Sequence, residues 1–249
     1  MTVRVRRVVL AVDAAERTVR IVREAVEVAS SLGAELEGLF VEDDALLRLA
    51  QHGFARRVGA TGAGRELASG ELEREWRALA CEVREALERE ARARSVRTLF
   101  AVERGAVEAA LRARLVGGDV VIVAWGGWSP SALRRPAPVR VLYDGHEDAE
   151  RALEVGLAIA GERGELVVWV APDRARAADL AVRVRERVGD RVARVRFAGI
   201  EDAAPSTIRR AVGDEPGGFL IVPGGHELAA RLAQRSVAAR FPCSVVIVH

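Results

Sequence analysis

Short apolar runs alternate with amphipathic stretches at the start of the chain. Residues 8–12 form an uninterrupted apolar run of strand length that Asp13 ends, and residues 36–41 are predicted to form the next short strand. Between them, apolar side chains recur every three or four positions over about 16–32, as on one face of a helix, and Gly33 follows as its stop. Continuous apolar strands suit a parallel sheet that is covered on both faces. The pattern therefore predicts a strand–helix–strand unit with a right-handed crossover.

The same pattern returns in the second half of the chain. A strand is predicted over 139–143, where Asp144 ends it, a helix over about 148–163 with Gly164 as its stop, and the next strand over 166–170. The spacing from the aspartate to the stop glycine is the same in both halves.

A second match lies further along each half. Residues 120–128 resemble residues 218–226, because each segment is a buried strand that breaks into a glycine pair, Gly126-Gly127 in one and Gly224-Gly225 in the other. Two matches in the same order indicate an internal duplication. The proline-containing stretch 129–138 is a poor helix or central strand and marks the boundary, so we predict one domain over 1–135 and another over 136–249.

The first half carries an insertion at about 43–75 and has no room for a final helix and strand before the boundary. A helix is predicted at the start of the insertion, a loop over 59–64, and a long amphipathic helix over about 66–94. The residues that tend toward one face of the first of these helices are Leu46, Leu47, Ala50, Phe54 and Val58. The insertion is one candidate to cover the sheet edge that the missing strand leaves open.

Composition limits the chemistry. All 38 basic residues are Arg, which excludes reactions that need a Lys amine, including Schiff bases and the lysine of the phosphate-binding P-loop. The net charge of +2 gives no reason to expect binding to nucleic acid or to an anionic membrane. No apolar run has the length of a signal-peptide core or a membrane span, so we expect a cytoplasmic protein.

The order of these segments resembles the universal stress protein family. Residues 8–41 are similar to the opening of such a domain, 102–115 to its third strand and next helix, and 119–127 to its fourth strand. Residues 240–248 resemble its closing strand, with Ser244 where a proline is usual. The resemblance implies an α/β fold of two Rossmann-like (adenine nucleotide alpha hydrolase-like) doubly wound parallel sheets, the first truncated and carrying the helical insertion. It also implies ATP as a ligand of many members.

Ligands of such sheets bind outside the carboxyl ends of the strands, where the strand order reverses. The candidate cofactor-binding residues at this edge are Val12, Asp13, Val41, Gly126, Gly127, Asp144, Gly224 and Gly225. By resemblance, the aspartate that ends the first strand of each half lies near adenine and ribose. Each aspartate can equally cap the following helix, which needs no ligand, and both interpretations stay open.

The glycine-rich stretch of the ATP-binding members is incomplete here. Those members have Gly-x-x-Gly, nine further residues, and then Gly followed by Ser or Thr, whose N–H groups cradle phosphates. The first half runs from Gly126-Gly127 into the proline-containing linker, and the second half has no further Gly-Ser pair after Gly224-Gly225. A side chain prevents the close backbone approach that glycine allows. The usual mode of ATP binding is therefore not expected in either half, and ATP or another adenine nucleotide stays only an alternative cofactor.

No catalytic or metal site is predicted. The four histidines are scattered without metal-ligand spacing, residues 146–148 are interpreted as a helix start, and no nucleophile elbow of the Gly-x-Ser-x-Gly type is present. Cys243 enters a buried strand and is expected to be inert, and Cys81 lies beside Glu82 and is expected to be a poor nucleophile.

These observations favour a non-enzymatic regulatory or binding protein of the universal stress type with a lost or reduced nucleotide site. It would act through self-association, as a homodimer or an internal pseudo-dimer, or through unknown protein partners. The alternative is a weak ATP- or AMP-binding protein, or a slow ATPase, that uses an altered site at Asp13 and Gly126-Gly127.

Overall fold

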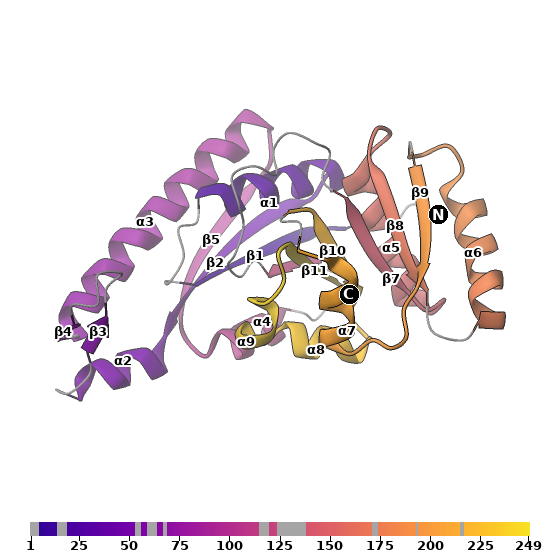
Figure 1. Ribbon diagram of the computed structural model, residues 1–249. Helices are drawn as coiled ribbons and strands as arrows, with labels where there is room; N and C mark the ends of the chain where they lie inside the picture. Colours follow the sequence, from indigo (N-terminus) through magenta and orange to yellow (C-terminus); the bar gives the residue numbers. More distant parts are fainter. Residues whose placement is uncertain are drawn as a thin grey trace.

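The computed structural model describes residues 5–13, 19–52, 56–58, 64–66, 69–114, 120–123, 138–170, 174–192, 194–214 and 217–249. A nine-stranded sheet lies between two layers of helices, and a separate pair of short strands lies at one end of the molecule (Figure 1).

In the first half, strands and helices alternate along the chain except at β3 and β4, which follow each other directly. Its strands are β1 (Arg7–Asp13), β2 (Glu35–Asp43), β3 (Arg56–Val58), β4 (Gly64–Glu66), β5 (Thr98–Gly105) and β6 (Val120–Val123). Its helices are α1 (Val19–Leu32), α2 (Asp44–Gln51), α3 (Ser69–Ala93) and α4 (Val107–Arg114).

In the second half, strands and helices alternate except at α8 and α9, which follow each other directly. Its strands are β7 (Val139–Tyr143), β8 (Glu165–Val170), β9 (Arg194–Gly199), β10 (Phe219–Pro223) and β11 (Ser244–Val248). Its helices are α5 (Glu147–Ala160), α6 (Arg174–Val188), α7 (Pro205–Val212), α8 (Glu227–Leu232) and α9 (Arg235–Ala238).

The strand order is β5-β2-β1-β6-β11-β10-β7-β8-β9. Every neighbouring pair is parallel except β6 and β11, which are antiparallel. The predicted fold class, an α/β fold with a mostly parallel sheet, is confirmed. The two predicted sheets are joined into one, because β11 pairs with the edge of β6. The helical insertion does not cover that edge, so this part of the prediction was wrong.

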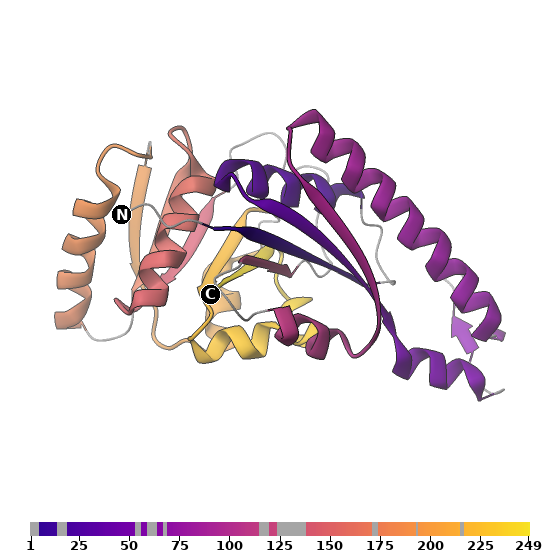
Figure 2. The same ribbon diagram turned by 180° about the vertical axis from the view of Figure 1, so that it is seen from behind.

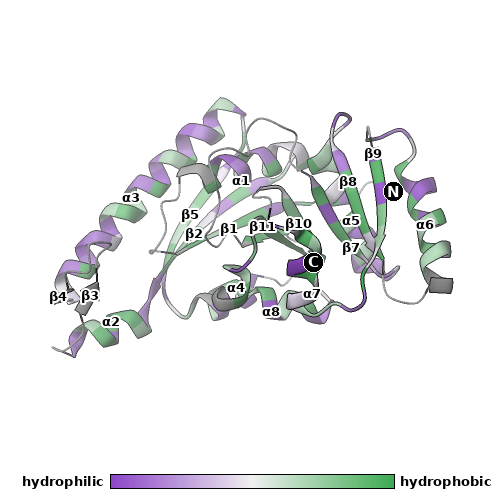
Figure 3. Ribbon diagram, in the orientation of Figure 1, coloured by the Kyte–Doolittle hydropathy of each residue, from purple (hydrophilic) through white to green (hydrophobic). Residues whose placement is uncertain are grey.

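Two apolar layers hold the sheet. One face packs against α1, α3, α5 and α6, and the other packs against α4, α7, α8 and α9. Most residues of the strands that are covered on both faces are apolar, with buried charged exceptions such as Glu37 on β2 and Arg140 on β7 (Figure 3). Gly38 on β2 allows a close approach of α3, because a Cβ there would come within 2.9 Å of the side chains of Leu87 and Phe100.

The insertion forms an extension at one end of the molecule. Helix α2, the β3–β4 pair and the start of α3 lie together there in both views (Figure 2). Leu47 and Ala50 are buried against this end of the core. The predicted helix is shorter than expected: it ends at Gln51, and Val58 belongs to β3, which pairs antiparallel with β4. Gly64 lies in β4 rather than in a loop, while Phe54 and residues 59–63 lie outside the described residues.

Helix α5 ends earlier than the sequence pattern predicts. Gly161, with a φ of 62°, takes the left-handed position after the last turn, and its N–H donates to the carbonyl of Leu157 at 3.0 Å. Gly164 lies in the turn that follows, where a Cβ would collide with the carbonyl of Ala160. Gly164 thus allows the tight turn that leads into β8, and it is not the helix stop.

The two parts of the sheet are also tied through side chains. Ser244, at the start of β11, is buried, and its hydroxyl donates to Oε2 of Glu24 on α1 at 2.8 Å. A proline at this position would remove both this hydroxyl and the N–H of Ser244, which donates to the carbonyl of Gly218 at 3.1 Å. The serine that departs from the family pattern therefore has a structural role where the two halves meet.

Candidate functional site

The carboxyl ends of β1 and β2 bring three predicted site residues together. Asp13 at the end of β1 pairs in register with Val41 on β2, and Val12 precedes it. Val12 and Val41 are buried in the core. The glycine pair Gly126-Gly127 lies outside the described residues, so only this part of the predicted first site can be placed.

The equivalent aspartate of the second half follows β7. Oδ1 of Asp144 accepts a hydrogen bond from the N–H of His146 at 3.0 Å, which holds the turn that leads into α5. Helix α5 then begins at Glu147, with three acidic residues in its first turn. Residues 146–148 are thus a helix start, as predicted, and the local turn uses one oxygen of Asp144.

Two N–H groups of the second glycine turn, those of Gly224 and His226, have partners within the protein. The Gly224 N–H donates to the carbonyl of Val248 at 2.6 Å, and the His226 N–H donates to the carbonyl of Pro223 at 3.1 Å. The first turn of α8 is also capped, since Nδ1 of His226 accepts from the N–H of Leu228 at 3.1 Å. A phosphate-binding turn needs such N–H groups to point at the ligand.

Two side chains cover this turn. A Cβ at Gly224 would collide with three atoms of the His249 imidazole, and a Cβ at Gly225 would come within 2.5 Å of Oδ2 of Asp148. The two glycines therefore allow a close approach, and the groups that approach them are the chain's own imidazole and carboxylate.

The imidazole of His249 is in a desolvated position. Its Nε2 is buried and has no hydrogen-bond partner among the described residues. Burial lowers the pKa of His249, and the nearby carboxylate of Asp148 opposes this shift. At neutral pH the imidazole ring is therefore uncharged, and it packs against Gly224 of the turn.

Asp148 and His249 were not among the predicted site residues. His249 directly follows the apolar run of the last strand, and this position alone places it at the carboxyl edge of the sheet. Asp148 lies in the first turn of α5, beside the predicted Asp144. The pairing order of β7, β10 and β11, which puts both residues beside Gly224-Gly225, could not be read from the sequence.

The turn after β7 is covered as well. Gly145 has a φ of 84°, and a Cβ there would come within 2.6 Å of Leu180 on α6. On the same side, the Tyr143 hydroxyl donates to Oε1 of Glu150 at 2.5 Å, and Arg183 donates to the same oxygen at 3.1 Å. Burial raises the pKa of Tyr143, so its hydroxyl stays protonated.

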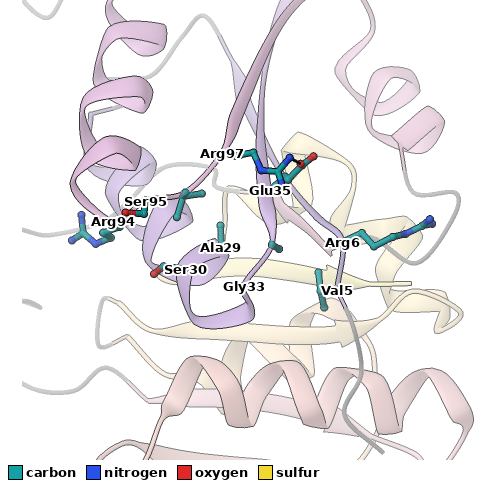
Figure 4. A pocket seen from close by; sticks show the side chains of 11 residues that line it. Val5, Arg6, Ala29, Ser30, Gly33, Glu35, Arg94, Ser95 and Arg97 are labelled. Atoms are coloured by element: carbon teal, nitrogen blue, oxygen red, sulfur yellow. Dashed lines mark ion pairs between the residues drawn. The ribbon is translucent and has the colours of Figure 1, made fainter.

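A hollow of about 600 Å³ lies elsewhere, in the first half (Figure 4). It is lined by residues at the amino ends of β1, β2 and β5, on the side of the sheet away from the predicted site. Its arginines are engaged in ion pairs: Arg97 contacts Glu35 at 3.2 Å, and Arg94 contacts Glu27 and Glu90. This hollow thus does not coincide with the candidate cofactor-binding residues.

Of the two cysteines, Cys243 is buried, as predicted from the sequence, and directly precedes β11. Burial raises the pKa of the Cys243 thiol to about 11, so it is inert at neutral pH, whereas Cys81 is exposed on α3.

Within the described part of the chain, no group of three His, Cys, Asp or Glu side chains could hold a metal ion. No described helix is both long and apolar enough to cross a membrane.

Comparison with solved structures shows what this fold resembles. A universal stress protein from Archaeoglobus fulgidus DSM 4304 aligns over 97% of each chain, with a TM-score of 0.54 and 15% sequence identity. The cytoplasmic domain of a prokaryotic cation chloride cotransporter aligns over 98% of this chain and 95% of that one, with a TM-score of 0.43 and 9% identity, which is too low for an argument. No protein-family model and no curated protein matches the sequence. At these identities the likeness shows a universal stress protein-like fold and nothing finer.

Proposed function

We propose that this chain is a regulatory or binding protein of the universal stress type that has lost nucleotide binding in its second half. The observation that carries this proposal is the covered glycine turn. The His249 ring and the Asp148 carboxylate lie where backbone N–H groups would have to approach phosphates.

Electrostatics and hydrogen bonding support the same conclusion. The carboxylate of Asp148 beside Gly225 would repel a phosphate, because like charges at short range disfavour each other strongly away from bulk water. The N–H groups of Gly224 and His226 already have carbonyl partners, so a ligand would have to break bonds within the protein.

We also propose that the chain is an internal pseudo-dimer of two related domains, about 1–135 and 136–249. The order β5-β2-β1-β6 has a counterpart in β9-β8-β7-β10 when both are read from the outer edge of the sheet toward its centre. The second half adds β11, which pairs antiparallel with β6 as strands do across a two-fold axis. The duplicated sequence spacing supports this division. Its function would then be exerted through self-association or protein partners.

Thermal unfolding with and without millimolar Mg-ATP, AMP and cyclic dinucleotides tests the proposal. A ligand that binds only the folded state raises the stability, by about 2.7 kcal/mol at one hundred times its Kd. We expect no change in Tm with any of these nucleotides. A rise of several degrees that Asp13→Ala abolishes would establish the alternative, a weak nucleotide site in the first half, and overturn the proposal for the protein as a whole.

A further inference from the structure

The sheet has two outer edges, and they differ in their protection. At one edge, β9 is short and carries the exposed residues Arg194 and Arg196, and the guanidinium of Arg185 lies 4.8 Å from the ring centroid of Phe197. Charged residues on an edge strand discourage pairing with another chain. The edge at β9 is therefore guarded.

The other edge, β5, is open and apolar. Leu99 and Val102 on this strand are 59% and 50% exposed, and the adjoining helix α2 exposes Leu46 and Leu49. Of the five exposed large hydrophobic residues in the described part of the chain, only Val182 lies elsewhere. Among the described strands, none pairs with the outer side of β5. An edge of this kind is a template for strand addition.

The backbone of β5 restricts how another strand can pair with it. The Leu36 N–H donates to the carbonyl of Arg97 at 2.9 Å, so the backbone groups of Arg97, and of every second residue after it, point toward β2. Because successive residues of a strand point their backbone groups to opposite sides, those of Thr98, Phe100 and Val102 point to the open edge. These are the residues that can form hydrogen bonds with an added strand.

An antiparallel copy of β5 centred on Phe100 meets this restriction. Phe100 then forms a hydrogen-bonded pair with Phe100 of the second copy, and Thr98 pairs with Val102. The residues that do not form hydrogen-bonded pairs also match. Leu99 lies opposite Ala101, and Arg97 lies opposite Glu103. Each of these pairs occurs once on each side of the two-fold axis. A shift of the centre to Ala101 would instead place Leu99 opposite Glu103.

The charges needed for this register are present. The side chain of Arg97 is 87% exposed, and that of Glu103 is 42% exposed. Arg114 donates to both oxygens of Glu103 and lowers its pKa, so this carboxylate stays ionised well below neutral pH. Arg97 and Glu103 lie on the face of β5 that packs against α4, and cross-strand pairs of opposite charge on one face stabilise antiparallel strands.

We propose that a second copy of this chain docks on the outer edge of β5, in the antiparallel register centred on Phe100. The dimer extends the sheet across a two-fold axis, with Arg97 of each copy paired with Glu103 of the other. This interface deepens the self-association part of the proposed function and rests on it, but it is independent of the nucleotide site.

Sedimentation equilibrium of the full chain tests the interface. The wild-type protein is expected to be a dimer. Arg97→Glu replaces both cross-strand attractions by repulsions and raises the dimer dissociation constant about tenfold, whereas Arg97→Lys keeps it within about threefold. Val102→Lys places an ammonium group within the paired edge, opposite Thr98 of the second copy, and yields monomers.

Val182→Lys on α6 is the matched control, because Val182 is exposed to the same degree as Val102 and lies away from β5. This variant stays dimeric if the proposal holds. A wild-type monomer at about 100 µM protein would overturn it. So would a dimer that neither Arg97→Glu nor Val102→Lys weakens, or one that Val182→Lys weakens equally. None of these outcomes changes the nucleotide result, so the two proposals fail separately.

Discussion

After α1 and after α3, one residue takes a positive φ and ends the helix. This residue is Gly33 after α1 and Ser95 after α3. After α1, Gly33 takes a φ of 62° and the Ala34 N–H donates to the carbonyl of Ala29. After α3, Ser95 takes a φ of 55° and the Val96 N–H donates to the carbonyl of Ala91. The left-handed conformation costs an L-residue more than it costs glycine. Gly33 could be predicted as a helix stop, whereas nothing marks Ser95 as one.

This difference gives a prediction with opposite signs at two matched sites. Ser95→Gly relieves the left-handed strain and should raise the free energy of unfolding by about 0.5 kcal/mol. Gly33→Ser introduces that strain and should lower it by about 1 kcal/mol. Urea unfolding measures both variants. Equal signs for the two changes would contradict this account of the helix ends.

The two cysteines should differ in reactivity. Burial raises the pKa of Cys243 to about 11, above the value of about 8.5 for an unfolded thiol, so the folded protein keeps this thiol neutral. The resulting contribution to stability is complete below about pH 8.5 and is lost as the pH rises through 11. Alkylation at pH 8 followed by mass spectrometry should modify Cys81 in the native protein and Cys243 only after unfolding. With Cys81→Ser, rapid native labelling of Cys243 would show that the core is open there.

Among the elements, regular strands and helices were predictable and irregular ones were not. The period of the apolar residues identified β1, β2 and β7 because both faces of these strands are buried. The insertion was harder to predict, since Leu46 to Val58 continue an apolar pattern although α2 ends at Gln51. A short strand such as β3 depends on its pairing with β4, which no local pattern encodes.

The contact between α1 and β11 gives a prediction for the joint between the halves. Ser244→Ala removes the half-buried hydrogen bond to Glu24 and should lower the free energy of unfolding by about 1.5 kcal/mol, since bonds to charged groups are among the stronger ones. Ser31→Ala is the control, because this exposed hydroxyl donates only to the carbonyl of Glu27 and its loss should cost less than about 0.5 kcal/mol. Denaturant unfolding that found equal effects would rule out a special role for the joint.

At the scale of the whole molecule, the repeated strand–helix–strand pattern predicted the fold class but not the way in which the two parts of the sheet pair. The antiparallel pairing of β6 with β11 is a contact between distant parts of the chain. The sequence indicates that no strand of the first half follows β6, but it does not indicate that β11 pairs with β6 instead. The site was predictable only in part. Glycine spacing placed Gly224-Gly225 at the carboxyl edge, whereas the cover by Asp148 and His249 depends on the strand order.

The most direct test of the account is amide hydrogen exchange, measured by NMR at Gly224 and Gly225 with and without millimolar Mg-ATP. If the chain's own side chains close this turn, exchange at both amides should be the same in the two samples, with Gly224 protected throughout by its bond to Val248. A nucleotide whose phosphates bind the turn would slow exchange at Gly225 and would require the His249 ring to move. Added protection there in the presence of Mg-ATP would contradict the closed site and restore a nucleotide-binding function.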